Sequence, residues 1–162
     1  MNNKLLIIGC GYLGRRLAQR AIDMNWRVVS TTRSAERADE FAHQGIEPVV
    51  TDIAQPADRA DPLPTCDAVV WAVGFDRSAG SDKRHVWIDG IRNVVNRLDT
   101  ANPPSVFCLV SSVSVYGDSD GAKVSEASMP EPTTESGQAC LDMERAFRET
   151  LQARCSNTTD VI

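Results

Sequence analysis

The feature that most constrains this chain is a short apolar run that passes directly into three closely spaced glycines. Lys4–Ile8 is almost wholly apolar, which is typical of a strand buried on both faces of a parallel sheet. Gly9, Gly11 and Gly14 follow in the spacing G-x-G-x-x-G. The next apolar residues recur at helical spacing: Leu13, Leu17, Ala18, Ala21 and Ile22. A strand that turns through glycine into an amphipathic helix predicts the first unit of a parallel α/β fold.

Each glycine has a physical role if this turn binds a dinucleotide. Gly9 permits a tight turn, Gly11 lets the backbone approach a diphosphate, and Gly14 lets the helix pack closely on the strand. The helix N-terminus adds N–H groups and the positive end of its dipole. The alternative is a glycine turn that binds no ligand. We expect a nicotinamide dinucleotide to contact the whole turn: Gly9, Cys10, Gly11, Tyr12, Leu13 and Gly14.

The end of the second predicted strand favours NADP over NAD. NAD-selective sites usually place Asp or Glu there for the ribose 2′-hydroxyl, whereas this chain has Thr31-Thr32-Arg33-Ser34. Arg33 is placed to meet a 2′-phosphate, aided by the hydroxyls of Thr32 or Ser34, and Arg37 could add charge one helical turn later. The alternative interpretation is a solvated arginine at a helix start, with NAD as the cofactor.

Strand and helix patterns alternate along the rest of the chain. The expected strands are Lys4–Ile8, Arg27–Thr32, Glu47–Val50, Asp67–Val73, Ser105–Ser111 and the opening of a sixth at Thr158–Ile162. A second helix is capped by Ser34, runs through Phe41 and stops at Gly45. The last two helical faces are Val86, Gly90, Ile91, Val94, Val95 and Leu98, ended by Pro103-Pro104, and Leu141, Met143, Ala146, Phe147 and Leu151. Gln55–Pro64 and Gly117–Gly137 are expected to be loops.

This alternation predicts right-handed βαβ units in a doubly wound parallel sheet, a three-layer α/β/α Rossmann fold. We expect one dinucleotide-binding domain over residues 1–162. The sequence stops inside a predicted strand with no closing helix, so we expect a truncated protein that lacks its C-terminal substrate-binding segment.

Composition excludes several other classes. The net charge of −5 argues against nucleic acid and anionic membranes as partners, and no run approaches the length of a membrane-spanning helix. The N-terminus lacks the features of a signal peptide. The five cysteines are scattered, without a C-x-x-C pair or a neighbouring histidine cluster: Cys10, Cys66, Cys108, Cys140 and Cys155. We therefore expect a cytoplasmic protein with free thiols and no metal site.

The segment Val110–Gly117, V-S-S-V-S-V-Y-G, together with the glycine turn resembles the atypical and extended short-chain dehydrogenases/reductases, the NAD(P)-dependent epimerase/dehydratase family. The resemblance covers nearly the whole chain. It implies that Asp52 and Ile53 contact adenine and that Ala72-Val73-Gly74 lies along the cofactor, with Ser111 also in the cofactor site. Other matching positions are Gly90, Glu126, Pro130 and Pro132.

The resemblance also implies a catalytic arrangement that this chain does not complete. In that family a serine or threonine binds the substrate oxygen, a position that corresponds to Ser112. A tyrosine then acts as general acid/base, and a lysine four residues later lowers its pKa. Here Ser136 and Cys140 occupy those two positions, while the following acid, Glu144, is retained. Further departures are Ile8, in place of the first glycine of the fuller motif, and Trp87, in place of an asparagine.

Substitutes for the missing acid are weakly indicated. Tyr116 follows Ser112 by four residues, which in an extended chain points both side chains the same way. A packed aromatic ring is the more favoured interpretation of Tyr116. His85 and Lys83, near the fourth helical pattern, are expected to face solvent, and Cys140 is either a reactive thiol at a helix N-terminus or a packed one.

Two functions therefore compete. The first is an NADP-dependent oxidoreductase or epimerase that acts on a carbonyl or sugar-nucleotide-like substrate, with Ser112 orienting it and Tyr116 as a weak candidate acid. The second is a catalytically inactive dinucleotide sensor or partner-docking module of the same fold. The V-S-S-V-S-V-Y-G segment counts against a third, the N-terminal piece of an FAD- or NAD-linked enzyme of another family. A homodimer through Val95, Leu98 and Phe147 is a candidate assembly, although these residues fit a core face equally well.

Overall fold

The computed structural model describes residues 3–74, 82, 84–117, 121–155 and 160–161. Its centre is one parallel sheet of six strands in the order β3-β2-β1-β4-β5-β6. The strands are β1 (Lys4–Ile8), β2 (Arg27–Thr32), β3 (Ile46–Val50), β4 (Ala68–Trp71), β5 (Val106–Leu109) and β6 (Asp160–Val161). The doubly wound α/β prediction is confirmed.

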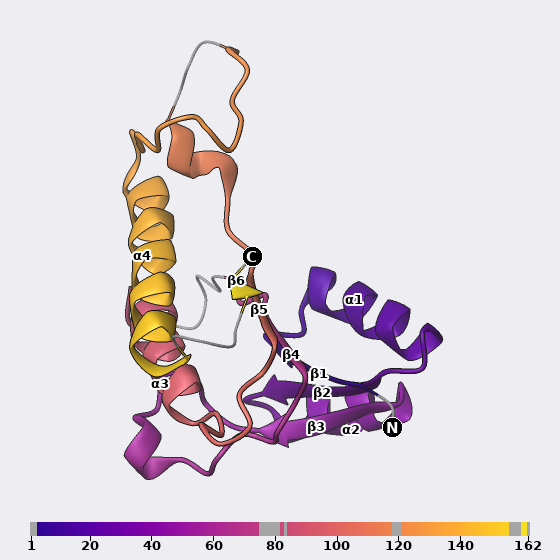
Figure 1. Cartoon of the computed structure of the whole chain (residues 1–162). Coiled ribbons are helices and arrows are strands. Elements are labelled where there is room, and N and C mark those ends of the chain that lie inside the picture. The colour runs from indigo at the N-terminus through magenta and orange to yellow at the C-terminus, as the bar shows by residue number, and fades with distance from the viewer. Residues whose placement is uncertain (1–2, 75–81, 83, 118–120, 156–159, 162) are drawn as a thin grey trace.

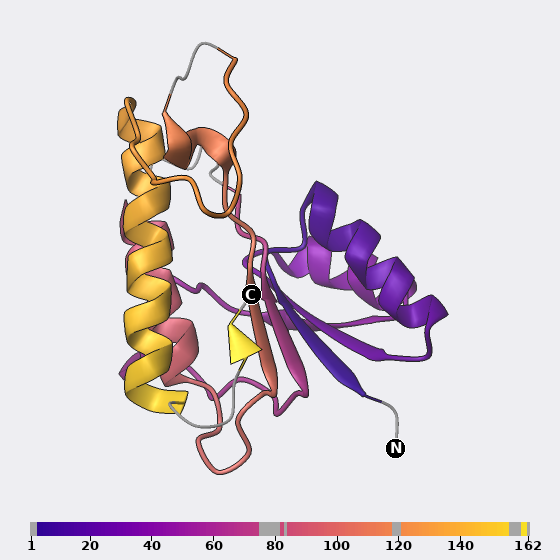
Figure 2. The same ribbon diagram turned by 45° about the horizontal axis from the view of Figure 1, so that its top comes forward.

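In the described ranges, four α-helices cover the two faces of this sheet (Figures 1 and 2). They are α1 (Tyr12–Asp23), α2 (Ala35–His43), α3 (Gly90–Asn96) and α4 (Glu135–Cys155). Helices α1 and α2 lie on one face, and α3 and α4 lie side by side on the other. The three-layer arrangement is therefore confirmed.

Alternate side chains of β1 enter two hydrophobic cores, one on each face of the sheet. Leu5 and Ile7 face the core under α1 and α2, whereas Leu6 and Ile8 face the core under α3 and α4. Successive side chains of a strand point to opposite faces, so an apolar run of this length is needed to serve both cores. This explains why Lys4–Ile8 lacks the polar alternation of a half-exposed strand.

The sheet order reverses at β1, which pairs with β2 on one side and with β4 on the other. Leu6, for example, lies opposite Val29 of β2 and Val69 of β4. The crossover helices leave this point in opposite directions, so a crevice opens beyond the carboxyl ends of the strands. That crevice is where ligands bind in open α/β sheets.

Two predicted strands, Asp67–Val73 and Ser105–Ser111, are shorter in the structure. β1 ends at Ile8, where Gly9 turns the chain into α1, and the N–H of Ala72 makes the last bond to it, donating to the Ile8 carbonyl at 2.8 Å. β4 therefore has no partner beyond this point and ends at Trp71. β5 ends at Leu109 for the same reason, after Val110 N–H donates to the Trp71 carbonyl at 2.9 Å.

Three helical details also differ from the sequence expectation. The chain before α3 winds as a π-helix over His85–Asp89, and a short 3-10 helix at Ala57–Arg59 interrupts the loop predicted at Gln55–Pro64. Val113–Tyr116 forms another 3-10 helix, whereas an extended chain was expected. Of the predicted strand Thr158–Ile162, Asp160–Val161 pairs with β5 as β6, and its other residues lie outside the described part. No helix among the described residues combines the length and apolarity that crossing a membrane requires.

Candidate functional site

A cavity of about 370 Å³ lies at the carboxyl ends of β1, β2 and β4, at the reversal of the sheet order. It is lined by ten residues predicted to bind a cofactor: Gly9, Cys10, Gly11, Thr32, Arg33, Asp52, Ile53, Ala72, Val73 and Gly74. The other lining residues are Thr31, Arg37, Phe41, Thr51, Ala54 and Val86. The structure thus brings most of the predicted cofactor residues together around one cavity.

The three glycines of the turn have different surroundings. Gly9 has φ +89°, and a Cβ there would lie 2.8 Å from the Cα of Val73. A Cβ on Gly14 would lie 2.7 Å from the carbonyl oxygen of Gly9, so this glycine is required by close packing of α1 on the turn. A Cβ on Gly11 would meet no atom within 4 Å. The backbone at Gly11 is therefore open toward the cavity.

The start of α1 offers backbone donors beside this opening. Gly11 is its N-cap residue and contributes no side-chain cap. The first N–H groups of a helix lack partners inside it, so they remain available to an anion. Tyr12 and Leu13 do not line the cavity, and their side chains face solvent, with Arg16 stacked over the Tyr12 ring at 3.6 Å. Any contribution of these two residues to ligand binding would come from their backbone N–H groups.

Two arginines lie at the far end of the cavity, beyond β2. The Thr32 hydroxyl accepts a hydrogen bond from the Ser34 N–H at 3.2 Å, and the Ser34 hydroxyl accepts one from the Arg37 N–H at 3.3 Å. These bonds fix the turn from β2 into α2. Arg33 and Arg37 both line the cavity and are exposed, and neither forms an ion pair with any residue that the structure describes. Ser34 itself caps α2 and does not line the cavity.

Cys10, a residue of the glycine turn, is buried. Burial raises its pKa, partly offset by a hydrogen bond with Ser30 and by the positive charges of Arg15 and Arg37. A protonated buried thiol is a poor nucleophile. We therefore regard Cys10 as part of the cavity wall.

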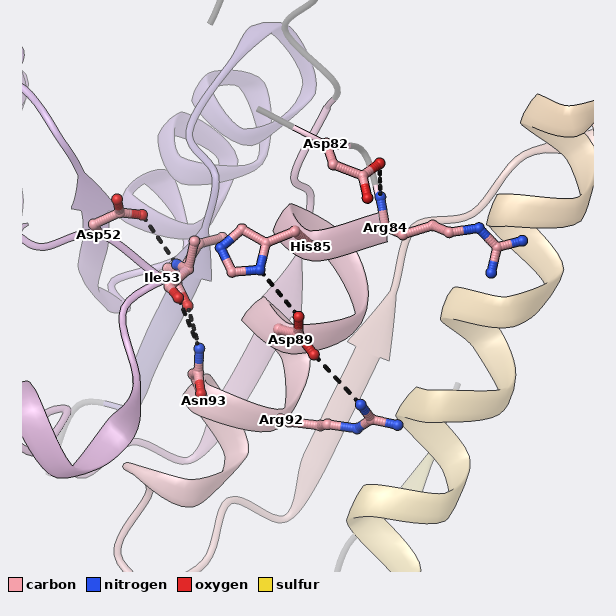
Figure 3. A network of polar contacts seen from close by, with 9 residues as sticks. Asp52, Ile53, Asp82, Arg84, His85, Asp89, Arg92 and Asn93 are labelled. Atoms are coloured by element: carbon pink, nitrogen blue, oxygen red, sulfur yellow. Dashed lines mark hydrogen bonds and ion pairs between the residues drawn. The ribbon is translucent and has the colours of Figure 1, made fainter. Parts of the chain in front are cut away.

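The opposite wall is the turn that follows β3 (Figure 3). The Asp52 carboxylate accepts a hydrogen bond from the Ala54 N–H at 3.0 Å, closing a tight turn. The side-chain amide of Asn93, on α3, donates to the carbonyl oxygens of Ile53 and Ala54, each at 3.2 Å. This wall is therefore held both from within the turn and from the helix behind it.

The chain that enters α3 carries charged side chains near this wall. His85 lies 3.0 Å from the Asp89 carboxylate, and Arg92 lies 3.4 Å from it (Figure 3). Arg84 forms an ion pair with Asp142 of α4 at 2.6 Å. His85 is exposed, as expected, and Lys83 lies outside the described residues.

The serine segment after β5 is not part of the cavity lining and is bonded to α4. Ser111, a predicted cofactor residue, donates to the Glu144 carboxylate at 2.5 Å and is not among the residues that line the cavity. Ser112 caps the 3-10 helix and accepts from both the N–H and the hydroxyl of Ser114, at 3.3 and 3.0 Å. The Ser114 hydroxyl also lies 3.8 Å from the Cys140 sulfur.

The expected extended geometry of Tyr116 is wrong. The 3-10 helix at Val113–Tyr116 breaks the alternation that would have aligned Tyr116 with Ser112, because Ser112 caps a turn and does not continue the strand. The partly buried Tyr116 packs against the core under α3 and α4. The structure agrees with the interpretation of Tyr116 as a packed aromatic ring.

The two positions that the family fills with Tyr and Lys lie on the first two turns of α4. Ser136 is exposed, and Cys140 is 3% exposed within the core. The interpretation of Cys140 as a reactive thiol at a helix N-terminus is wrong, because α4 begins at Glu135 and its second turn is buried. Trp87 is likewise buried in the core.

The predicted dimer residues are also core residues. Val95, Leu98 and Phe147 are buried within the chain, with the Phe147 ring edge-on to that of Phe107 at a centroid distance of 4.9 Å. These three side chains therefore do not form an open face. Across the part of the chain that the structure describes, no group of three or more His, Cys, Asp or Glu residues could hold a metal ion.

Several residues of the site were missed from the sequence. Thr31, Phe41 and Val86 belong to elements that the sequence predicted, but their apolar or β-branched character indicated only burial. Ala54 follows the Asp52-Ile53 pair directly, so adjacency could have identified it. Asn93 gave no sequence signal, because its partners lie 39 and 40 residues away.

Comparison with known proteins agrees with this geometry. A family model described as NAD(P)H-binding matches residues 9–154. Protein YeeZ of Escherichia coli (strain K12) is 26% identical over 145 residues, which are 87% of this chain and 52% of YeeZ. The chain thus spans about half the length of this curated relative.

Solved structures share the fold over almost the whole chain. A short-chain dehydrogenase/reductase superfamily protein from Agrobacterium tumefaciens with bound NAD has a TM-score of 0.75 and 19% identity, covering 98% of this chain and 47% of that one. The UDP-Glc/GlcNAc 4-epimerase from Campylobacter jejuni has a TM-score of 0.72 and 17% identity, covering 99% and 52%. The structural neighbours are therefore proteins of the dehydrogenase/reductase and epimerase type.

Proposed function

Because the chain belongs to the NAD(P)H-binding family, we propose that it binds NADP(H) in the cavity beyond β1, β2 and β4. The observation that carries this proposal is the pair Arg33 and Arg37 lining the cavity, at the end of a second strand that bears no acid. A 2′-phosphate carries negative charge and accepts several hydrogen bonds, for which an exposed guanidinium is a well-matched donor.

The residues present fit a dinucleotide along the rest of the cavity. The open backbone at Gly11 and the first N–H groups of α1 suit a diphosphate, since no side chain fills the space there. Asp52, Ile53 and Ala54 form a wall suited to adenine, and Ala72, Val73 and Gly74 line the side nearest β4. A bound nicotinamide dinucleotide supplies a hydride donor or acceptor.

For the reaction, we propose an oxidoreductase or epimerase that acts on a carbonyl or sugar-nucleotide-like small molecule. The support is Ser112, whose hydroxyl oxygen accepts two hydrogen bonds from Ser114. A hydroxyl that accepts in this way can direct its own hydrogen outward, toward a substrate oxygen. Ser112 would then bind and orient the substrate.

A dinucleotide sensor without turnover is the second candidate, and a specific observation favours it. The Lys position of the family pattern holds Cys140, a buried thiol in contact with Ser114. Such a group cannot lower the pKa of a phenol or hold a ribose as an ammonium does. The described structure thus places no ammonium on that turn of α4.

The binding proposal is tested by titrating NADPH and NADH separately against the wild-type protein, Arg33→Gln and the double variant Arg33→Gln/Arg37→Gln. We expect the wild type to prefer NADPH, and each variant to lose about 10- to 100-fold in NADPH affinity while NADH affinity is unchanged, since only the charged contact is removed. Arg20→Gln, an exposed arginine of α1 remote from the cavity, is the matched control. Equal affinity of the wild type for the two cofactors would contradict the assignment of NADP.

The reaction proposal is tested by incubating the protein and NADPH with a panel of carbonyl compounds and sugar nucleotides. A rate that collapses in Ser112→Ala, with NADPH affinity retained, supports an enzyme. Retained NADPH binding without turnover of any substrate supports the sensor.

A further inference from the structure

The turn that closes the adenine end of the cavity has few bonds of its own. After β3 ends at Val50, the Thr51 N–H donates to the Thr32 carbonyl at 2.8 Å, which is the last bond to the sheet. The Ala54 and Gln55 N–H groups then bond back to the side chain and carbonyl of Asp52, at 3.0 and 3.2 Å. These bonds use two N–H groups of the turn and the Asp52 carbonyl, and leave the carbonyls of Ile53 and Ala54 for partners outside the turn.

Asn93 supplies those partners from the helix behind the turn. Its amide nitrogen lies 3.2 Å from the carbonyl oxygen of Ile53 and 3.2 Å from that of Ala54 (Figure 3). Because both neighbours are acceptors, the nitrogen and not the oxygen of the amide must face them. One side chain thus bonds two consecutive carbonyls of the wall.

The same helix contacts the turn through apolar atoms one turn earlier. A Cβ on Gly90 would lie 3.5 Å from Cδ1 of Ile53 and 3.1 Å from the ring of Trp71. Ile53 therefore packs against the backbone of α3 itself. Polar contact at Asn93 and apolar contact at Gly90 together fix the turn against the helix.

We propose that Asn93 is a positioning residue for the adenine half of the dinucleotide, acting through the backbone of Ile53 and Ala54. The inference rests on the proposed function, since it assumes that this cavity holds NADP(H). Asn93 does not line the cavity and has no direct contact to offer a ligand. Because Asn93 contacts only the wall at the adenine end, its substitution should weaken binding of the adenine half of the cofactor and leave binding of the nicotinamide half unchanged.

The test measures the two halves by isothermal titration: 2′,5′-ADP for the adenine half and reduced nicotinamide mononucleotide for the other. We expect Asn93→Leu to weaken 2′,5′-ADP about tenfold, as expected for two lost hydrogen bonds, and to leave the mononucleotide unchanged. Asn96→Leu is the matched control, because Asn96 lies one turn further along α3 and its side chain accepts instead from Arg154 at 3.0 Å. It should leave both affinities unchanged.

Equal weakening of both halves, or an unchanged 2′,5′-ADP affinity, would overturn the role of Asn93 while the proposed function stands. A wild-type protein that binds neither 2′,5′-ADP nor NADPH would instead overturn the proposed function, and the inference with it. If Asn93→Leu does not fold, the side-chain amide of Asn93 in the ¹⁵N-labelled wild type decides the matter. Its resonance should shift with 2′,5′-ADP and not with the mononucleotide, and an unshifted resonance would overturn the inference.

Discussion

At the scale of single residues, the three glycines of the turn have different roles: the fold requires two of them, and the third is proposed to serve ligand binding. Gly9 needs its positive φ, and Gly14 leaves no room for a Cβ beside the Gly9 carbonyl. Gly11 meets neither restriction, since its φ is −83° and the space beside it is open. We therefore expect a bound ligand, and not packing within the chain, to require glycine at that position.

This difference predicts opposite phenotypes for three alanine substitutions. Gly9→Ala and Gly14→Ala should each lower the free energy of unfolding by about 1–3 kcal/mol, the first through backbone strain and the second through overpacking. Gly11→Ala should leave that free energy within about 0.5 kcal/mol of the wild type, yet weaken NADPH, because the new methyl group occupies the space proposed for the diphosphate. Urea denaturation without ligand and NADPH titration measure the two effects. A Gly11→Ala variant with full NADPH affinity would show that the diphosphate lies elsewhere.

At the scale of elements, the first turn of α2 combines a helix cap with the arginines of the proposed 2′-phosphate site. Ser34 caps α2 and so holds the first turn of the helix, which carries Arg37, beside Arg33. A side chain at this position affects both the stability of the helix and the charge near the proposed 2′-phosphate. The two effects can be separated, because aspartate caps a helix about as well as serine does.

We expect Ser34→Ala to lower the free energy of unfolding by about 1 kcal/mol, and Ser34→Asp to leave it nearly unchanged. Ser34→Asp should nevertheless weaken NADPH several-fold relative to NADH, because a carboxylate beside the two arginines opposes a phosphate dianion. Paired titrations and denaturation curves for both variants check this. A Ser34→Asp protein that keeps the wild-type ratio of NADPH to NADH affinity would argue against a 2′-phosphate site at this end of β2.

The elements that sequence could predict are those fixed by local patterns. The apolar run at Lys4–Ile8, the glycine turn and the cap at Ser34 each depend on neighbouring residues, and all three are confirmed. The strand ends at Trp71 and Leu109 depend on where the neighbouring strand stops, which no local pattern records. Residues of the candidate site that depend on such distant neighbours could not be predicted either.

The parts of the site that could not be predicted from the sequence are those that depend on contacts between residues far apart in the chain. Family resemblance predicts Ser111 in the cofactor site, and no sequence pattern indicated that its hydroxyl bonds Glu144, 33 residues away. Cys140 was open to two interpretations until the packing of α4 showed it buried. Asn93 acts on a turn that follows a different strand, so only the folded chain reveals it.

At the scale of the whole molecule, three thiols on different parts of the fold have raised pKa values. Burial raises the pKa of Cys10, and it raises that of Cys108 as well. Burial, followed by the negative charge of Asp67, raises the pKa of Cys66 to about 12. Because these residues lie in β1–α1, before β4 and in β5, their titration reports on unfolding of the entire domain.

Burial favours the uncharged, protonated thiol in the folded chain, and this fixes how the free energy of unfolding changes with pH. Between the ordinary thiol pKa, near 9, and the raised values, the unfolded chain has released protons that the folded chain still holds. Raising the pH through this range therefore favours unfolding, and the stability present below about pH 9 is lost progressively above it. The maximum slope is about −1.4 kcal/mol per pH unit for each such thiol.

Cys66→Ala should make the decline of stability with pH shallower, because Cys66 has the widest interval between its folded and unfolded pKa values. Urea denaturation of both proteins from pH 7 to pH 10.5, with a reductant to prevent disulfide formation, measures the slopes; parallel curves would mean that Cys66 ionises as readily in the folded chain as in the unfolded one.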